Sequence, residues 1–346
     1  MQALVLTEVG HFDLTRLDDP QPGWGEVRIA VTQSGICGSE LGGFLGTDGL
    51  RRPGLVFGHE FVGVVDGYGA GVHEQDRLPL GTLVTANPLQ SCGRCSICLA
   101  GQGNVCPRRS LLGGHVNGSN ADLVVVPVAA VHRVDQLPDP GASIFAEPTA
   151  CALRAVGRTR VGAGGTALVL GAGPIGLLLI EVLRVVGVGT ALFTERVPGR
   201  AGAAEASGAI RLSDDPEVLL EQVGQHTDGR GVDAVFDAVG SADTRLAATR
   251  AVRPGGDVCF VGLHSADATL GVRDLIRREV TCTTSFAYSP AEFERAVQML
   301  GRGQIVFRGG VVRAGLDAGQ HWYEELIKGN SAGKVVLEPQ FHGTAP

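Results

Sequence analysis

The sequence predicts an α/β protein with a β-rich N-terminal domain and a second domain built on a doubly wound parallel sheet. Short apolar runs separated by Gly, Pro and Asp occupy the chain from residue 1 to about residue 140. After Phe145, apolar strands alternate with stretches of helical periodicity. Closely spaced short strands indicate a barrel or sandwich, and strands that alternate with helices indicate a parallel sheet covered on both faces.

The composition is that of a globular protein without a nucleic-acid or membrane partner. The 346 residues carry a formal charge of −7, with 44% apolar and 19% charged residues. Nucleic-acid binders show a basic surface, and a membrane span needs about 18 or more consecutive apolar residues. The N-terminal segment lacks the basic and apolar regions of a signal peptide, so we expect a cytoplasmic protein. Two lysines against 27 arginines indicate a GC-rich bacterial coding bias.

In the N-terminal part, the apolar runs 3–6, 27–31, 61–65 and 122–126 are the predicted strands. Between them lies a short segment, about 88–107, that holds half of the eight cysteines of the chain. They form a C-x2-C-x2-C-x7-C pattern: Cys92, Cys95, Cys98 and Cys106. Two disulfides, an iron–sulfur cluster and unconnected buried thiols are the alternatives. The compartment argues against disulfides, and a ferredoxin pattern has three residues before its last cysteine. A closed structural zinc site is favoured.

The parallel-sheet part begins with the apolar strand 166–170, which a glycine-rich turn joins to an amphipathic helix. A second strand, 190–194, ends at Glu195, and further strands are predicted at 232–236 and 257–261. The remaining chain holds a helix over 291–300 and an end strand at 334–337.

The turn Gly171-x-Gly173-x-x-Gly176 predicts a dinucleotide site because of its context between a buried strand and a helix. The glycines allow a tight turn, close approach of a pyrophosphate and close packing of helix on strand. Pro174 suits the first helical turn. An acid nineteen residues after Gly176, Glu195, favours NAD, while Arg196 and Arg200 leave NADP open. The predicted cofactor-binding residues are Gly171, Gly173, Pro174, Ile175, Gly176, Glu195, Arg196 and Arg200. The alternative is a glycine-rich turn of an unrelated α/β domain.

Three further segments carry metal-binding residue types: Cys37 in GICGSE, His59-Glu60 in FGHEF, and Glu147 in FAEPT. Spacing alone cannot connect them. Each also has a purely structural interpretation, as a buried small side chain, a core histidine and a helix-start carboxylate.

Taken together, these segments resemble the zinc-dependent medium-chain dehydrogenases, in the sorbitol-like polyol branch of the alcohol dehydrogenase superfamily. Further matching segments are PGWGEV from Pro22 and GKVV from Gly333. The resemblance implies a GroES-like catalytic domain (1–145, with the zinc lobe), a Rossmann NAD-binding domain (146–287) and a C-terminal return (288–346). It places the active site between the domains.

The resemblance also implies a catalytic zinc held by Cys37, His59, Glu60 and Glu147, with Glu60 or Glu147 as the direct carboxylate ligand. In such enzymes zinc lowers the pKa of the substrate alcohol and hydride passes to the nicotinamide. Ser39 matches the hydroxyl that takes the alcohol proton. The predicted catalytic residues are therefore Ser39, Cys37, His59 and Glu60.

Two positions depart from the family pattern. Gly42 stands where many relatives have a histidine that passes the proton to solvent. The relay is therefore expected to end through water, the cofactor ribose or another side chain, with His115 as a candidate whose alternative is a surface-loop histidine. Glu40 replaces the aspartate that orients the zinc-bound histidine, and such partners change metal affinity 10-fold to 100-fold.

The predicted function is oxidation of a secondary alcohol of a polyol, sugar, cyclitol or small diol, or the reverse reduction. The alternatives are a threonine-type or secondary-metabolite dehydrogenase and a catalytically silent NAD-binding protein. We expect two zinc ions per chain, NAD, a small hydroxylated substrate, and a homodimer or homotetramer built through an edge strand near 281–286. The sequence does not identify the substrate.

Overall fold

The structure is a computed structural model that describes residues 1–329 and 333–339. The chain divides into two compact units. Unit 1 consists of Met1–Glu147, Ser289–Gly303 and the described part of Val311–Pro346, and unit 2 of Pro148–Tyr288 and Gln304–Gly310. No helix among the described residues is long and apolar enough to cross a membrane.

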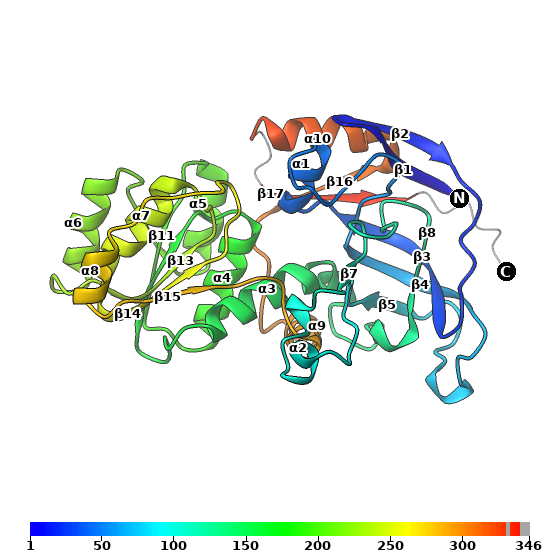
Figure 1. The fold of residues 1–346 in the computed structure, drawn as a ribbon, viewed down its shortest axis with the longest axis horizontal. Coiled ribbons are helices and arrows are strands. Elements are labelled where there is room, and N and C mark those ends of the chain that lie inside the picture. The colour runs from blue at the N-terminus through cyan, green and yellow to red at the C-terminus, as the bar shows by residue number, and fades with distance from the viewer. Residues whose placement is uncertain (330–332, 340–346) are drawn as a thin grey trace. The chain divides into compact units, whose positions relative to one another are not determined.

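Unit 1 is built on a seven-stranded sheet in the order β16-β17-β3-β4-β5-β9, with β8 paired to β3. Strand β17, from the far end of the chain, runs antiparallel beside β3 (Figure 1). Strands β1 and β2 form a separate antiparallel hairpin, which packs within the same unit. The strands are β1 (Gln2–Glu8), β2 (His11–Arg16), β3 (Glu26–Gly35), β4 (Glu60–Tyr68), β5 (Leu83–Ala86), β8 (Leu123–Pro127), β9 (Val131–Arg133), β16 (Gly310–Gly315) and β17 (Gly333–Glu338).

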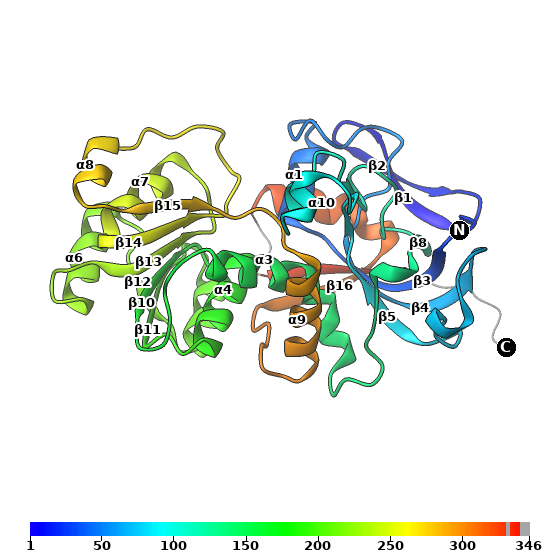
Figure 2. The ribbon, with the colours of Figure 1, turned by 60° about the horizontal axis from the view of Figure 1, so that its bottom comes forward.

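Short helices and a small lobe complete unit 1. Helix α9, orange in Figure 2, packs against the 3-10 turn η4, so that the C-terminal chain returns to the N-terminal part. The lobe holds the two-stranded sheet of β6 and β7. These elements are α1 (Gly38–Phe44), η1 (Glu74–Asp76), β6 (Leu89–Gln90), α2 (Ser96–Leu99), η2 (Gly103–Val105), β7 (Ser110–Leu111), η3 (Val128–Ala130), η4 (Pro140–Phe145), α9 (Pro290–Gly301), η5 (Leu316–Ala318) and α10 (Gly319–Ile327).

Two apolar clusters in unit 1 are larger than the third, which is formed by Ala3, Val5, Val56 and Ala121. One lies on the sheet, where alternate residues of β3, such as Val27, Ile29 and Val31, point inward. The other joins the hairpin, α1, α10 and β17 around the buried aromatic rings Phe12, Phe44, Phe57 and Tyr323. The second cluster fixes α1 and α10 against each other, which matters for the metal site.

Unit 2 is a six-stranded, fully parallel sheet in the order β12-β11-β10-β13-β14-β15. Chain order reverses at β10, so the sheet is doubly wound. The strands are β10 (Thr166–Leu170), β11 (Thr190–Thr194), β12 (Ile210–Leu212), β13 (Val232–Asp237), β14 (Val252–Phe260) and β15 (Thr281–Thr284). The helices are α3 (Ala146–Gly157), α4 (Pro174–Val185), α5 (Pro198–Ala206), α6 (Pro216–His226), α7 (Ala242–Ala251) and α8 (Val272–Arg277).

Sequence signals account for these helices. Proline at the first position starts α4, α5 and α6, and Ser241 begins α7 with a capping box to Thr244. Leu168 and Leu170 of β10 are fully buried in a cluster with residues of α6 and α7. The predicted fold class is therefore confirmed.

The division into units differs from the domain boundaries expected above at residues 146, 147 and 288 and in one longer segment. Gln304–Gly310 belongs to unit 2, although it lies inside the expected C-terminal return. Arg308 forms an ion pair with the buried Glu181 of α4, and Arg184 donates to the carbonyl of Gln304. These contacts attach the segment to unit 2.

Candidate active site and metal centres

Unit 1 gathers Cys37, His59 and Glu60 at one point. Cys37 lies between β3 and α1, and His59 and Glu60 stand at the start of β4. One donor atom of each residue lies within 4.8 Å of the other two. Gly58 has φ +100°, and a Cβ there would lie 2.6 Å from the backbone nitrogen of Asn120. Only glycine allows the chain to turn this sharply into His59.

The carboxylate of Glu60 is buried, and its two oxygens have different surroundings. Its Oε2 forms an ion pair with the buried ammonium of Lys334, on β17. Its Oε1 has no hydrogen-bond partner. Burial alone would lower the pKa of Lys334, but the charges of Glu60 and Cys37 outweigh it and raise that pKa. An unpaired buried carboxylate oxygen beside a thiol and an imidazole suits a bound cation.

Glu40 orients His59 despite its extra methylene. Its Oε1 lies 2.8 Å from His59 Nδ1 and accepts a hydrogen bond from Gly58 N at 3.0 Å. Its Oε2 accepts a 2.5 Å hydrogen bond from the hydroxyl of Tyr323. Burial would raise the pKa of Glu40, but the neighbouring His59 outweighs it and lowers that pKa. Glu40 therefore remains a carboxylate and directs the other ring nitrogen of His59 away from itself.

Glu147 is not part of the group around Cys37. It lies in the first turn of α3, and its charge contributes to raising the pKa of Lys334. Among the described residues, only Cys37, His59 and Glu60 form a possible metal group in this region.

Ser39 lies on α1 next to the thiol, and its hydroxyl donates to Cys37 Sγ at 3.3 Å. Arg51 fastens this turn, because its NH1 donates to the carbonyl of Ser39 and its Nε to the carbonyl of Gly113. A Cβ at Gly42 would already be in van der Waals contact with Asp48 and Thr47, at 3.4 and 3.6 Å. The loop that contains Thr47 and Asp48 therefore lies next to position 42, where many relatives have the histidine.

His115 is poorly suited to end the proton relay. Its Nδ1 accepts a hydrogen bond from Leu111 N at 3.0 Å, which leaves the proton of the neutral ring on Nε2. Burial and the charges of Arg109 and Arg51 lower its pKa. The neutral ring has no free acceptor, so His115 offers only a donor.

The four cysteines of the lobe surround a single point. Their sulfurs are separated by 3.8 Å (Cys92–Cys98), 3.5 Å (Cys95–Cys98), 3.8 Å (Cys95–Cys106) and 3.6 Å (Cys106–Cys92). A tetrahedral zinc with Zn–S bonds of about 2.3 Å needs sulfurs about 3.8 Å apart. Disulfide sulfurs would be about 2.05 Å apart, and an iron–sulfur cluster would place several iron atoms between the sulfurs. The geometry fits one zinc ion.

The electrostatics of the lobe also suit a cation. A backbone N–H of Arg94 lowers the pKa of Cys92 to about 5, and the guanidinium of Arg108 donates to Cys92 Sγ at 3.3 Å. Burial raises the pKa of Cys98 to about 11. The metal-free lobe therefore holds thiolate and thiol together at neutral pH.

The glycine-rich turn has the geometry of a phosphate-binding loop. Gly171 has φ +87°, and a Cβ at Gly176 would lie 1.9 Å from the carbonyl oxygen of Gly171. A Cβ at Gly173 would meet nothing within 4 Å, so this side of the turn is open. Pro174 and Ile175 begin α4 directly after this turn, and the N-terminus of a helix favours a bound phosphate.

Glu195 follows β11 and reaches the same turn. Its Oε2 accepts from Ala172 N at 2.9 Å and its Oε1 from Val197 N at 2.8 Å. Arg196 is engaged in an exposed ion pair with Asp214, at 2.7 Å. Arg200 lies in the first turn of α5. The carboxylate is thus held at the loop, while the Arg196 side chain is drawn to Asp214.

Comparison with known proteins identifies the family of the chain. Residues 23–138 match the alcohol dehydrogenase GroES-like domain, and residues 174–302 match the zinc-binding dehydrogenase domain. The chain belongs to the zinc-binding dehydrogenase family. The recognition and enzyme class expected from the sequence are confirmed.

Individual relatives match the dehydrogenase along almost its whole length. Sorbitol dehydrogenase of Halalkalibacterium halodurans is 30% identical over 98% of this chain and 99% of its own. D-arabitol-phosphate dehydrogenase of Enterococcus avium is 30% identical over 93% and 92%. The crystal structure of a putative zinc-binding dehydrogenase from Sinorhizobium meliloti, bound to NADP, has a TM-score of 0.87 and 29% identity, covering 98% of this chain and 99% of that one.

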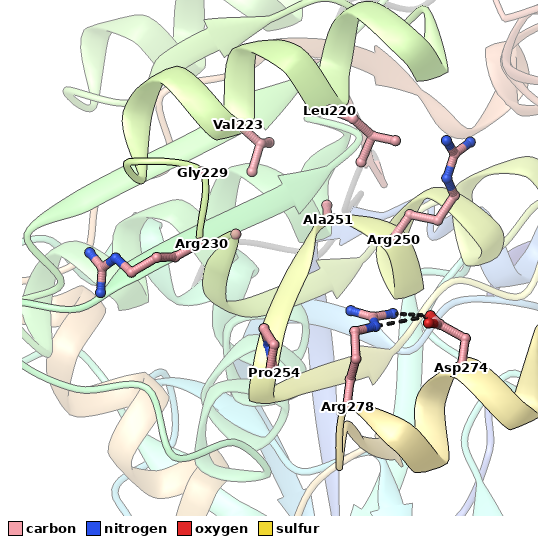
Figure 3. Close-up of a pocket in the computed structure, with 11 residues that line it drawn as sticks. Leu220, Val223, Gly229, Arg230, Arg250, Ala251, Pro254, Asp274 and Arg278 are labelled. Atoms are coloured by element: carbon pink, nitrogen blue, oxygen red, sulfur yellow. Dashed lines mark hydrogen bonds and ion pairs between the residues drawn. The ribbon is translucent and has the colours of Figure 1, made fainter.

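A pocket of about 410 Å³ in unit 2 lies apart from every predicted site residue. It is formed by α6, α7 and α8 and the turns that follow them, and Figure 3 shows the Arg278–Asp274 ion pair inside it, with Arg230 and Arg250 pointing elsewhere. Arg278 also donates to the carbonyls of Val252 and Thr249. The charge of Arg278 is therefore compensated within the protein, and the lining residues show no arrangement of groups for catalysis.

Sequence analysis assigned no role to two residues of the dehydrogenase site, Lys334 and Tyr323. Lys334 lies in the quoted GKVV segment and is one of only two lysines in the chain, which was a usable signal. Tyr323 lies on an amphipathic helix and looks like any core aromatic. Its hydroxyl partner, Glu40, is 283 residues away in sequence.

Proposed function

We propose that this dehydrogenase oxidises a secondary hydroxyl of a polyol or sugar alcohol, or reduces the corresponding ketone, with NAD and a catalytic zinc ion. The observation that carries the proposal is the group of half-buried Cys37 with buried His59 and Glu60, in which one carboxylate oxygen has no hydrogen-bond partner among the described residues. Sorbitol and arabitol-phosphate dehydrogenases among the relatives support the substrate class.

Cys37, His59 and Glu60 would hold the zinc, leaving a position for the substrate oxygen. Bound zinc supplies Lewis-acid polarisation of that oxygen, and the nicotinamide accepts the hydride. Glu40 would keep the imidazole of His59 oriented, because its Oε1 contacts Nδ1 and leaves the other ring nitrogen for the metal. Lys334 offsets the charge of Glu60, which reduces the mutual repulsion of carboxylate and thiolate. Glu147 is proposed as an alternative carboxylate ligand.

Ser39 is proposed to accept the proton of the substrate hydroxyl. Its hydroxyl is adjacent to Cys37 Sγ and its backbone is fixed by Arg51. Because position 42 has no side chain and His115 offers only a donor, the proton would leave through water or the cofactor ribose.

The cofactor would bind at the open side of the Gly171–Gly176 turn, with Pro174 and Ile175 in the first turn of α4. Glu195 would accept hydrogen bonds from the adenosine ribose, which favours NAD over NADP because a 2′-phosphate would meet its charge. Arg196 and Arg200 are proposed to lie near this ribose. In this proposal unit 1 is the catalytic domain and unit 2 the NAD-binding domain.

We also propose that the dehydrogenase is a homodimer or homotetramer that associates through β15. This strand is at the edge of the unit 2 sheet, and neighbouring α8 exposes Val272 and Ile276, 60% and 70% accessible. An edge strand with exposed apolar neighbours is suited to pairing with a second copy.

The experiment is metal analysis of the purified protein together with activity on a polyol panel. We expect two zinc ions per chain, NADH bound more tightly than NADPH, and NAD-linked oxidation of at least one polyol. Cys37→Ser should lose one zinc and all turnover while remaining folded. Retention of full activity by Cys37→Ser would disprove the proposal.

A further inference from the structure

We propose that Tyr323 is a positioning residue for the metal ligand His59 and acts through Glu40. The inference rests on the proposed catalytic zinc and goes beyond it, because it assigns a role at the metal site to the C-terminal helix α10.

Tyr323 belongs to a fully buried polar network. Its hydroxyl donates to Glu40 Oε2 at 2.5 Å and accepts from Asn120 Nδ2 at 3.1 Å. Asn120 Oδ1 in turn accepts from Ser34 Oγ at 2.7 Å, and Ser34 contacts Ser119 Oγ at 2.7 Å. All five side chains belong to residues with 0% exposure. The network links β3, α1, α10 and the loop before β8.

The second carboxylate oxygen of Glu40 needs a hydrogen-bond donor of its own. Glu40 Oε1 is used by His59 and Gly58 N, which leaves Oε2 without a donor unless Tyr323 supplies one. A buried charged oxygen without a hydrogen bond is costly and would draw the carboxylate toward other donors. The bond to Tyr323 therefore fixes the torsion of the glutamate, whose longer side chain has one more rotatable bond than an aspartate.

The phenol itself is held in place by aromatic packing. Its ring centroid lies 4.6 Å from that of Phe12 and 5.6 Å from that of Phe44, and Phe57 packs against its edge at 6.2 Å. These three rings immobilise Tyr323 before any metal arrives. The hydroxyl thus presents a fixed donor to Glu40, and Glu40 a fixed acceptor to His59.

The test measures zinc release from the full-length, zinc-loaded protein to a chromophoric chelator. The phase due to the catalytic zinc is identified by its absence in Cys37→Ser. In Tyr323→Phe, which keeps the ring and removes only the hydroxyl, we expect this phase to become about 10-fold faster. The phase from the four-cysteine zinc should not change. With cobalt in place of zinc, the visible absorption of the Cys37–His59 site should shift.

The control is Tyr68→Phe, which removes a hydroxyl whose hydrogen bonds within the described part of the chain go to the backbone of Leu78 in the same unit. It should leave both release phases and the cobalt spectrum unchanged. In a Glu40→Ala background, Tyr323→Phe should have no further effect on zinc release, since its route to His59 is gone. Should Tyr323→Phe be insoluble, Asn120→Ser, which frees the phenol, should accelerate the same phase to a smaller extent.

The two proposals fail in different ways. A wild-type protein that holds no zinc dependent on Cys37 would overturn the proposed function. A wild-type protein that holds this zinc, with unchanged release rate and cobalt spectrum in Tyr323→Phe, would overturn the role of Tyr323 alone.

Discussion

Lys334 shows how a single side chain sets the charge of the buried site. Its ammonium forms an ion pair with Glu60, and the charges of Cys37 and Glu147 also contribute to raising its pKa. Both partners of the ion pair are almost completely buried, 3% and 0% exposed by side chain. Removing one partner of such a pair leaves the other charge without compensation.

We therefore expect Lys334→Met to lower the unfolding free energy of the metal-free protein by about 3–5 kcal/mol. With zinc bound, the loss should be smaller, because the cation then compensates Glu60. Denaturant unfolding with and without zinc measures both values. Lys328→Met, at the other lysine, removes an exposed pair with Glu325 and should cost at most about 1 kcal/mol. Equal losses in the two variants would contradict this account.

Glu195 is the residue that should determine cofactor preference. Glu195→Ala should weaken NADH binding about 10-fold or more, because hydrogen bonds to a charged group contribute about 1.5–3 kcal/mol. NADPH binding should weaken less or improve, since a like charge is removed. Glu195→Gln removes the charge but keeps one acceptor oxygen for Ala172 N, so it tests the charge with less change to the loop. Fluorescence titration with both cofactors gives the ratio, and an unchanged ratio in both variants would remove Glu195 from this role.

At the scale of elements, the end of β13 carries a buried acid. Asp237 Oδ1 accepts from Val239 N and Gly240 N, which shapes the turn against Gly171. Burial raises the pKa of Asp237 above the ordinary 3.8, and the backbone donors only partly offset it. For an acid with a raised folded pKa, the stabilising contribution is complete below the unfolded pKa and is lost as pH rises through the folded pKa.

Asp237→Asn keeps an acceptor oxygen and removes the titration. Relative to wild type, its unfolding free energy should therefore rise as pH increases from about 4 through the folded pKa, and then level off. Urea unfolding of both proteins over this pH range measures the difference. Parallel pH profiles would show that the carboxyl of Asp237 does not titrate abnormally.

The protonation of the cysteine lobe predicts how many protons are released when the lobe binds zinc. At pH 7 the metal-free lobe holds Cys92 as thiolate and Cys98 as thiol, from pKa values of about 5 and about 11. Zinc binding to the lobe should therefore release at least one proton but fewer than four. Calorimetry of a Cys37→Ser protein in buffers of different ionisation enthalpy counts these protons. Release of none or all four would contradict the assignment.

At the scale of the whole molecule, association should depend on the exposed apolar residues beside β15. We expect the wild type to be a dimer or tetramer by light scattering, and Ile276→Asp to shift it toward a smaller species. Leu80→Asp, at an equally exposed leucine of unit 1, 67% accessible, should leave the mass unchanged. A wild-type monomer, or an Ile276→Asp protein of unchanged mass, would disprove this interface.

The sequence predicted the fold class, and its expected strands lie within β1, β3, β4, β10, β11, β13 and β17, while the strand expected at 122–126 begins one residue before β8. The predicted strand 257–261 lies in β14 but overruns it by one residue, and the strand itself begins earlier, at Val252. The edge strand predicted near 281–286 is shorter in the structure, where β15 ends at Thr284. These local elements follow from periodicity and turn residues, which act over a few neighbours along the chain.

The two compact motifs were also readable in sequence, since four cysteines within fifteen residues and three glycines within six are each local. The group of Cys37, His59 and Glu60 was proposed only through family resemblance, because 22 residues separate Cys37 from His59 and nothing in the spacing joins them. The pairing of Lys334 with Glu60 and of Tyr323 with Glu40 was decided by tertiary structure alone. Lys334 of β17 contacts Glu60 at the start of β4, and Tyr323 of α10 contacts Glu40 of α1. Packing between such distant segments leaves no periodic signal in the chain.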